Sequence, residues 1–407
     1  MQDLYNLFVF RVEVCGRMKV LRAVGLISAT LCGGGVYLVK STDENVWQSI
    51  TMPLIRLLDA EQAHTSAVKL ASYGLVPSFK THTNDADLLK TRLWGISFDS
   101  PIGLAAGFDK HAQCMRGMLD MGFGFVEVGS ITPLPQVGNP KPRNFRLLPD
   151  DAVINRYGFN SFGHDYAEQN LSTYRKNVSE DVGVIGVNLG KNKESPDAVN
   201  DYVQGVKQLG QYADYLVINI SSPNTPGLRR MQGRDNLKCL VEAVLRVRDG
   251  LENKPPLLVK IAPDLNMDDK EDIAAVLTAP ETKVDGLIVS NTTITRPECL
   301  VDPNKVETGG LSGKPLREMS TGCVRDMYKL TGGQLTIVGA GGVFSGEDAY
   351  EKICAGASVV QLYSSLALRG PPVVGKVKRE LADILRANGF SNVSEAVGSQ
   401  VNLNDID

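Results

Sequence analysis

The stretch from Leu216 to Gly227, which reads LVINISSPNTPG, holds the densest set of side chains that could do chemistry. A short apolar run leads into five uncharged polar residues: Asn219, Ser221, Ser222, Asn224 and Thr225. Asparagine amides can orient a planar ligand through paired donors and acceptors, and a serine can act as a nucleophile or accept a proton. A strand that opens into such groups is typical of an α/β enzyme site, although an ordinary turn fits the same residues.

Seven other apolar runs also end in polar or glycine-rich segments. These segments are AAGFDK (105–110), GSITP (129–133), NLGKNK (188–193), KIAPD (260–264), SNTT (290–293), GAGGV (339–343) and QLYSS (361–365). If all eight runs are strands of one barrel, their carboxyl ends meet on one face and form a single site. Gly341 and Gly342, the hydroxyls of Tyr363 and Ser364, and the loop GGLSG (309–313) predict a phosphate position there, with tight turns as the alternative for any one loop.

The elements that must position these groups alternate between strand-like and helix-like patterns. Strands are predicted at Ile102–Ala105, Phe125–Val128, Val182–Val187, Leu216–Ile220, Leu257–Ile261, Gly286–Val289, Leu335–Val338 and Val359–Leu362. Helical patterns lie between most of them, for example at 235–251, 268–277, 317–330 and 346–355. Eight strands with crossover helices predict an α/β fold of the (β/α)8 TIM-barrel type. A doubly wound sheet is the alternative, but no G-x-G-x-x-G follows the first strand.

Composition narrows the class of function. The chain has 407 residues, of which 43% are hydrophobic and 22% charged, an ordinary globular balance. The net charge of −3 offers no electrostatic footprint for nucleic acid. Seven scattered cysteines without a C-x-x-C pair, and four dispersed histidines, predict no metal site and no disulfide framework.

The N-terminal segment predicts attachment to a membrane. Residues 1–22 are apolar and basic like a mitochondrial targeting presequence, although Asp3 and Glu13 are atypical of one. Residues 23–39 are uncharged and lie between Arg22 and Lys40, which predicts a short transmembrane helix. A cleaved secretory signal is the alternative.

Two short helices are expected next, at Val46–Leu58 and Ala60–Tyr73, forming a small domain over 45–77. Asp59 is the predicted N-cap of the second helix, with Gln62 completing a capping box and Gly74 following its end. The pair could pack on the main domain, but its position favours an amphipathic pair on the bilayer that forms a mouth for a lipid-soluble ligand. The barrel is assigned to 78–388, and the polar segment 389–407 is predicted to be a frayed tail.

Taken together, these motifs resemble the class 2, quinone-linked dihydroorotate dehydrogenases of the mitochondrial kind, from Val46 to about Arg369. The matching motifs are AAGFDK, FVEVGSITP, NRYGFNS, GVNLGKNK, NISSPNTPGLR, VKIAPDL, NTT, GGLSGKPL and GGV…QLYSS. The resemblance implies oxidation of (S)-dihydroorotate to orotate in pyrimidine biosynthesis, with bound FMN and ubiquinone as electron acceptor. It also implies a monomer in the inner mitochondrial membrane, held by a single-pass anchor in contact with lipid, with the catalytic domain facing the intermembrane space.

The resemblance also implies roles for individual residues. FMN-binding positions are Ala106, Gly107, Lys110, Ser130, Asn188, Asn219, Lys260, Ser290, Gly313, Gly342, Tyr363 and Ser364. Substrate-binding positions are Lys110, Asn155, Arg156, Tyr157, Gly158, Phe159, Asn219, Ser222, Asn224, Asn291 and Thr292. Lys110 would supply a point charge for the substrate carboxylate, and Lys260 would stabilise negative charge on the reduced flavin.

The same resemblance makes Ser222 the catalytic base, with Thr225 supporting a proton relay and Lys110 completing the catalytic set. Ser222 would take a proton from C5 of dihydroorotate while a hydride leaves C6 for flavin N5. Soluble class 1 relatives carry cysteine at this position. Quinone-tunnel positions are Met52, His64, Ala67, Arg146 and Tyr363. Phe162 departs from the family pattern, because histidine is frequent there.

Three other functions remain open on the sequence alone. Another FMN-dependent barrel, of the ene-reductase or hydroxyacid oxidase type, would share the cofactor but not the NISSPNT loop with Lys110. A flavin-free aldolase would use Lys260 as a Schiff-base lysine. A membrane-tethered binding module would have no need of so many polar groups at the strand ends.

Overall fold

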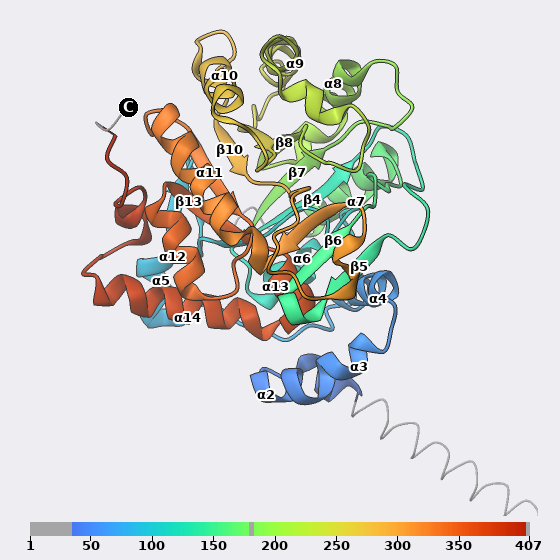
Figure 1. Ribbon diagram of the computed structural model, residues 1–407, viewed down its shortest axis with the longest axis vertical. Helices are drawn as coiled ribbons and strands as arrows, with labels where there is room; N and C mark the ends of the chain where they lie inside the picture. The colour runs from blue at the N-terminus through green and yellow to red at the C-terminus, as the bar shows by residue number, and fades with distance from the viewer. Residues whose placement is uncertain (1–34, 179–182, 404–407) are drawn as a thin grey trace, which may run out of the picture.

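The computed structural model describes residues 35–178 and 183–403 (Figure 1). The predicted presequence, and all of the predicted membrane span except residues 35–39, lie outside these ranges. Within the described ranges no helix is both long and apolar enough to cross a bilayer.

A closed barrel of eight parallel strands forms the centre of the molecule, in the order β10-β12-β13-β3-β4-β7-β8-β9. Its strands are β3 (Ile102–Leu104), β4 (Phe125–Ile131), β7 (Val184–Leu189), β8 (Tyr215–Asn219), β9 (Leu257–Ile261), β10 (Gly286–Val289), β12 (Thr336–Ala340) and β13 (Ala357–Leu362). The predicted barrel is therefore confirmed, and the doubly wound alternative is wrong. β4 runs three residues beyond the predicted end. β7 starts at Val184, and its predicted first residue, Val182, lies outside the described ranges.

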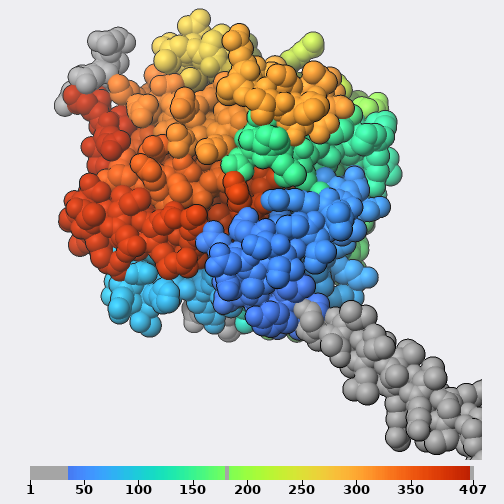
Figure 2. Space-filling model, turned by 60° about the horizontal axis from the view of Figure 1, so that its bottom comes forward, coloured from blue at the N-terminus to red at the C-terminus, as the bar shows by residue number. Residues whose placement is uncertain are grey.

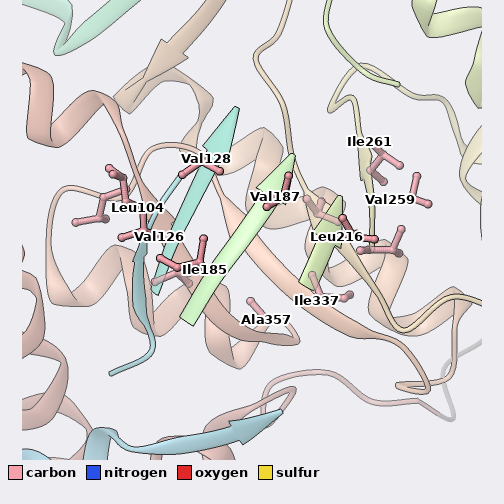
Figure 3. Packing of buried hydrophobic residues seen from close by; sticks show 14 of the residues in the cluster. Leu104, Val126, Val128, Ile185, Val187, Leu216, Val259, Ile261, Ile337 and Ala357 are labelled. Atoms are coloured by element: carbon pink, nitrogen blue, oxygen red, sulfur yellow. The ribbon is translucent and has the colours of Figure 1, made fainter. Parts of the chain in front are cut away.

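Helices surround the barrel. They are α6 (Met115–Met121), α7 (His164–Asn177), α8 (Ala198–Leu209), α9 (Arg234–Arg248), α10 (Met267–Thr278), α11 (Arg317–Leu330), α12 (Gly346–Cys354), α13 (Ser364–Arg369) and α14 (Pro372–Ala387), with α5 (Thr83–Leu89) before the first barrel strand. α9 shows why they pack there: its buried residues Leu237, Leu240, Val241, Val244 and Leu245 fall at helical spacing on one face. Figure 3 shows part of the apolar layer between strands and helices.

The barrel interior is apolar at the amino-terminal ends of the strands and becomes polar toward their carboxyl ends. A separate apolar cluster that includes Phe125, Val184, Tyr215, Leu258 and Val359 fills its amino-terminal end. Side chains of a strand point to the same face every second residue, so the next inward positions follow two residues later. These positions are Glu127, Gly186, Val217, Lys260 and Gln361, and the next along β7 and β8 are Asn188 and Asn219. The period of two thus places polar groups inward only near the carboxyl ends.

Two small sheets complete the barrel ends. A hairpin of β1 (Thr91–Leu93) and β2 (Ile96–Phe98) packs Phe98 into the interior cluster. At the opposite end, β5 (Asn144–Leu147), β6 (Ala152–Asn155) and β11 (Gly310–Gly313) form an antiparallel sheet.

The N-terminal helices rest on the barrel (Figure 2). They comprise α2 (Glu44–Val46), a π-helical turn (Trp47–Thr51), α3 (Met52–Arg56) and α4 (Ala60–Ser72). The side chains of Gln48 and Arg56 donate to the carbonyls of Arg369 and Leu368. Ile50, Leu54, Leu57 and Leu58 remain exposed. The pair therefore packs on the main domain and also keeps an apolar outer surface.

The ends of α4 follow the predicted capping rules. The Asp59 carboxylate accepts from the backbone N–H groups of Glu61 and Gln62. Among the described residues, the Gln62 side chain makes no return hydrogen bond to Asp59, so only one half of the predicted capping box forms. Gly74 adopts φ of +68° directly after the helix.

The prediction of a frayed tail from residue 389 is wrong for the described part. Val393 and Ala396 are fully buried, and the backbone N–H groups of Gly398 and Gln400 donate to the carbonyls of Ile353 and Cys354. Two apolar side chains thus fasten this segment to the end of α12. Residues 404–407 lie outside the described ranges.

Candidate active site

A cavity opens at the carboxyl ends of the barrel strands. Nineteen of the predicted site residues line it: Ala106, Gly107, Lys110, Ser130, Asn155, Tyr157, Gly158, Phe159, Asn219, Ser222, Asn224, Lys260, Ser290, Asn291, Thr292, Gly313, Gly342, Tyr363 and Ser364. They come from loops far apart in the sequence, so the barrel brings them together as predicted.

Glycines shape one end of the cavity. A Cβ at Gly342, whose φ is +74°, would lie 2.5 Å from the Cα of Arg317, and a Cβ at Gly313 would lie 2.3 Å from the carbonyl oxygen of Asp151. Only glycine fits at these two positions, because any side chain would meet the neighbouring backbone. The Ser364 hydroxyl donates to the hydroxyl of Ser312 at 2.9 Å. This end has the donors expected of a phosphate position.

Lys260 supplies a buried positive charge. Its side chain is only 6% exposed, and burial lowers its pKa while the carboxylate of Glu127 raises it. Among the described residues, none accepts a hydrogen bond from its Nζ. A buried ammonium without such a partner favours an acceptor-rich ligand in the cavity.

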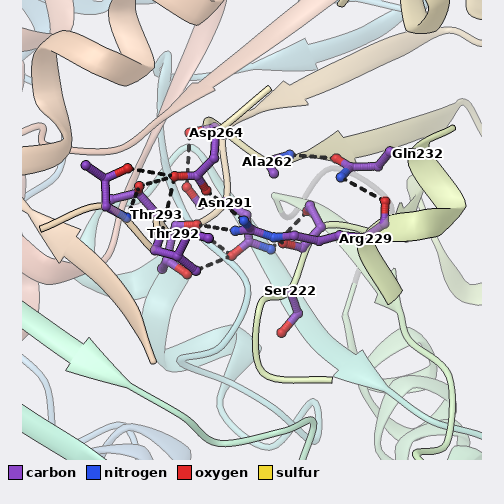
Figure 4. A network of polar contacts seen from close by, with 12 residues as sticks. Ser222, Arg229, Gln232, Ala262, Asp264, Asn291, Thr292 and Thr293 are labelled. Carbon is purple, nitrogen blue, oxygen red and sulfur yellow. Dashed lines mark hydrogen bonds and ion pairs between the residues drawn. The ribbon is translucent and has the colours of Figure 1, made fainter. Parts of the chain in front are cut away.

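The loop that carries Ser222 is clamped by Arg229 (Figure 4). Its guanidinium donates to the carbonyls of Ser221 and Thr292, at 3.1 and 2.9 Å, and pairs with Asp264 at 2.7 Å. Ser222 points away from this network, lines the cavity and is 7% exposed. Its Oγ accepts from the backbone N–H of Asn224 at 3.3 Å. The clamp thus holds the predicted base at the cavity wall.

The Lys110 side chain lines the cavity, and its pKa is lowered there. Its Nζ donates to the carbonyl of Gly107 at 2.7 Å and lies 4.3 Å from the centre of the Tyr157 ring. The His64 Nε2 lies 2.7 Å from the carbonyl of Phe108, so it carries the proton and leaves Nδ1 to accept from Lys110 at 3.3 Å. Burial lowers the pKa of Lys110 to about 7 and that of His64 to about 3. His64 is therefore neutral.

Of the residues predicted to bind FMN or substrate or to act in catalysis, three do not line the cavity. Asn188 is buried beneath it and accepts from the Ser130 hydroxyl. The guanidinium of Arg156 pairs with Glu307 at 2.6 Å. Thr225 is 4% exposed, and its Oγ1 has no hydrogen-bond partner among the described residues. The proposed proton relay through Thr225 stays a prediction.

The predicted quinone-tunnel residues are not all brought to one hollow. His64 lines a second, open hollow of about 2400 Å³ between α4 and residues 135–143, which shares Lys110, Tyr157 and Asn160 with the cavity. Met52, Ala67 and Arg146 line neither hollow. Arg146 instead donates to the carbonyl of Leu58 at 3.0 Å, which ties the end of α3 to β5.

Several site residues escaped the sequence reasoning. Arg229 closes the quoted motif NISSPNTPGLR, but its spacing gives no sign of the clamp on Asp264. Glu127 was recognisable as a charge inside the apolar strand FVEVGSI. The ring of Phe162, which departs from the family pattern, stacks on the His111 ring with centroids 3.9 Å apart.

Comparisons with known proteins identify the family of this chain. Residues 88–385 match the sequence model of the family described as "Dihydroorotate dehydrogenase". The chain is 52% identical to "Dihydroorotate dehydrogenase (quinone), mitochondrial" of Mus musculus, covering 93% of this chain and 98% of that protein. It is 50% identical to "Dihydroorotate dehydrogenase (quinone)" of Parvibaculum lavamentivorans, covering 87% and 99%.

A solved structure gives the same result. The ligand-free "DHODH" of Eimeria tenella superposes with a TM-score of 0.81 at 49% identity, covering 84% of this chain and all of that one. The family resemblance read from the motifs is thereby confirmed. The chain belongs to the dihydroorotate dehydrogenase family, among its quinone-dependent members.

Proposed function

We propose that this chain oxidises (S)-dihydroorotate to orotate in pyrimidine biosynthesis and passes the electrons to ubiquinone. One observation carries the proposal: an ammonium, three asparagine amides and a serine hydroxyl converge on a single cavity. These groups are Lys110, Asn219, Asn224, Asn291 and Ser222. Family membership favours this reaction over the ene-reductase, hydroxyacid oxidase, aldolase and binding-module alternatives.

The substrate carries a carboxylate and a ring with two amide-type edges, and the cavity offers matching groups. Lys110 would bind the carboxylate, because a compact ammonium suits an anion. Asn219, Asn224 and Asn291 would read the ring edges, because each amide offers both donors and an acceptor.

The residues present also fit FMN. The glycine cradle at 313 and 342, with the Ser364 hydroxyl, suits a phosphate group, and the buried Nζ of Lys260 suits an electron-rich ring edge. When bound, FMN supplies the two-electron acceptor that lets hydride leave the substrate. The chain supplies binding, orientation and exclusion of water.

Ser222 is proposed to accept the proton released from the substrate carbon. A free serine hydroxyl is a weak base, so it needs a group that takes its own proton onward. The unpartnered hydroxyl of Thr225 is proposed as that group, three residues further along the same loop. A positioned base typically contributes about 10²- to 10⁴-fold in rate.

Several finer statements belong to the same proposal. The mitochondrial relatives in mouse and rice support a mitochondrial location. We propose an inner-membrane monomer with a single-pass anchor at 23–39 and a catalytic domain facing the intermembrane space. The exposed apolar residues of the N-terminal helices, among them Leu54 and Leu57, would contact lipid and admit quinone toward the tunnel residues.

The direct test is to purify the full chain, identify its flavin, and follow dihydroorotate-dependent reduction of a soluble ubiquinone analogue. We expect FMN and orotate formation equal to the quinone consumed. A colourless protein with FMN-independent turnover, or an FMN protein inert toward dihydroorotate, would overturn the proposal.

A further inference from the structure

A chain of hydrogen bonds runs beneath the cavity, and all of its donors point the same way. The Asn291 Nδ2 donates to the Asn219 Oδ1 at 3.2 Å, and the Asn219 Nδ2 donates to the Ser130 Oγ at 2.9 Å. The Ser130 hydroxyl donates to the Asn188 Oδ1, and the Asn188 Nδ2 donates to the Glu127 Oε1 at 2.8 Å. The chain therefore starts at the substrate cradle and ends at a carboxylate.

Glu127 is the end of this chain because it can only accept. It is fully buried, and within the described part of the chain it is hydrogen-bonded to three groups: the Nδ2 of Asn188, the Nε2 of Gln361 at 2.6 Å and the hydroxyl of Tyr215 at 3.3 Å. All three are donors. An ionised carboxylate has no proton to give, so it forces both amides to present their N–H₂ groups to it.

We propose that Glu127 is a positioning residue that orients the amides of Asn188 and Gln361, and thereby holds the end of the hydrogen-bond chain that supports Ser130 and Asn219 at the cavity. This inference deepens the proposed function and depends on it. An amide is symmetric in shape but not in chemistry, and turning it over exchanges donor for acceptor. At the other end, the backbone N–H of Ser221 donates to the Asn219 Oδ1 at 3.3 Å and that of Thr292 donates to the Asn291 Oδ1 at 2.7 Å, so both ends of the chain require the same direction.

The same carboxylate orients Gln361. Because its Nε2 donates to Glu127, its Oε1 is left without a partner among the described residues, at a side chain that lines the cavity. Glu127 thus sets the orientation of both amides next to it, those of Asn188 and Gln361.

The local packing is built to admit this carboxylate. Gly186 lies opposite Glu127 in the β4–β7 register, and a Cβ there would lie 2.1 Å from the Tyr215 ring. The missing side chain lets the Tyr215 hydroxyl reach Glu127. Burial and the neighbouring Glu127 raise the pKa of Tyr215 well above its usual value, so this hydroxyl stays a donor.

Glu127 also supplies the counter-charge of the site. Burial lowers the pKa of Lys260, and the Glu127 carboxylate raises it again. Among the described residues, Lys260 and Tyr215 are the two titratable groups whose pKa values respond to the Glu127 carboxylate. Removing the carboxylate would therefore also move the pH at which Lys260 loses its proton downward.

The test is Glu127→Gln in the full-length holoenzyme, because glutamine keeps the shape but can donate as well as accept. Asn188 can then turn over, and the end of the chain that supports Ser130 is no longer held in one orientation. We expect orotate to bind roughly 10- to 100-fold more weakly, measured by its perturbation of the flavin spectrum, since charge-assisted hydrogen bonds to both amides are lost. FMN release should move to lower pH, because Lys260 without the neighbouring carboxylate loses its proton at a lower pH.

Two further variants make the result specific. Tyr215→Phe removes the third donor and leaves the chain and the charge intact, so orotate affinity should stay within about 3-fold of wild type. Glu127→Asp keeps the charge but shortens the reach, so the pH of FMN release should stay near wild type while orotate affinity falls. Melting curves identify any variant that fails to fold, and Glu127→Asp then carries the test alone.

Unchanged orotate affinity and unchanged pH of FMN release in folded Glu127→Gln would overturn the inference, as would equal losses in Tyr215→Phe. These outcomes are distinct from failure of the proposed function, which would appear in the wild-type protein as absence of FMN or of orotate binding.

Discussion

Replacing Gly342 by alanine tests whether the glycine cradle is shaped for a ligand. The φ of +74° at this position would cost an alanine about 1–2 kcal/mol. The new Cβ would also lie 2.5–2.6 Å from the N, Cα and Cβ atoms of Arg317. Two of these are backbone atoms at the start of α11, so the loop must move, at a further cost of about 1–3 kcal/mol.

The chain offers a matched control. Gly389 has φ of +76°, and a Cβ added there would meet nothing within 4 Å, so Gly389→Ala incurs only the backbone cost. We expect the free energy of unfolding to fall by about 1–2 kcal/mol in Gly389→Ala and by about 2–5 kcal/mol in Gly342→Ala.

The assay is chemical denaturation of each variant with and without added FMN, together with the flavin content of the purified protein. Gly342→Ala should lose most of its FMN, whereas Gly389→Ala should keep it. Equal destabilisation of the two variants, with FMN affinity unchanged in Gly342→Ala, would refute the reasoning about the cradle.

Two further predictions follow from the site. Because the folded pKa of Lys110 is lowered to about 7, its ammonium is lost as pH rises through that value, so kcat/KM for dihydroorotate should fall roughly tenfold per pH unit above it. A flat profile between about pH 6 and pH 9 would contradict this role. Arg229→Gln should lower kcat about 10- to 100-fold by loosening the Ser222 loop, whereas Arg230→Gln, at an exposed neighbour, should not. Equal kcat values in the two variants would show that the clamp is not needed.

The barrel was predictable because apolar runs and polar strand ends recur in phase. Each run has the length of a buried strand, and parallel closure leaves one face for all eight ends. The ends of single strands were less predictable: β4 continues to Ile131 because residues 129–131 are as buried as the strand before them. The docked segment around Val393 and Ala396 was missed because two small apolar residues do not stand out in a polar stretch.

The site was predictable in its membership but less so in its connections. Lys110 and Ser222 follow apolar strands, and their place directly after a strand is enough to predict that they lie at the cavity, because the barrel gathers its carboxyl strand ends on one face. The ion pair between Arg229 and Asp264 joins residues 35 positions apart, and the hydrogen bond from Lys110 to His64 joins residues 46 positions apart. No local pattern encodes such a pairing. The hydrogen bonds that join Glu127 to Asn188, Asn219 and Asn291 connect residues at the ends of four strands, β4, β7, β8 and β10.

The central claim is that Ser222 accepts the substrate proton at the cavity wall. The most direct measurement is the rate at which dihydroorotate bleaches the bound flavin in a single anaerobic turnover, in wild type and in Ser222→Ala. Because the variant lacks the hydroxyl that accepts the proton, bleaching in Ser222→Ala should be slower by about 10²- to 10⁴-fold at unchanged FMN content. Equal bleaching rates in the two proteins would contradict it.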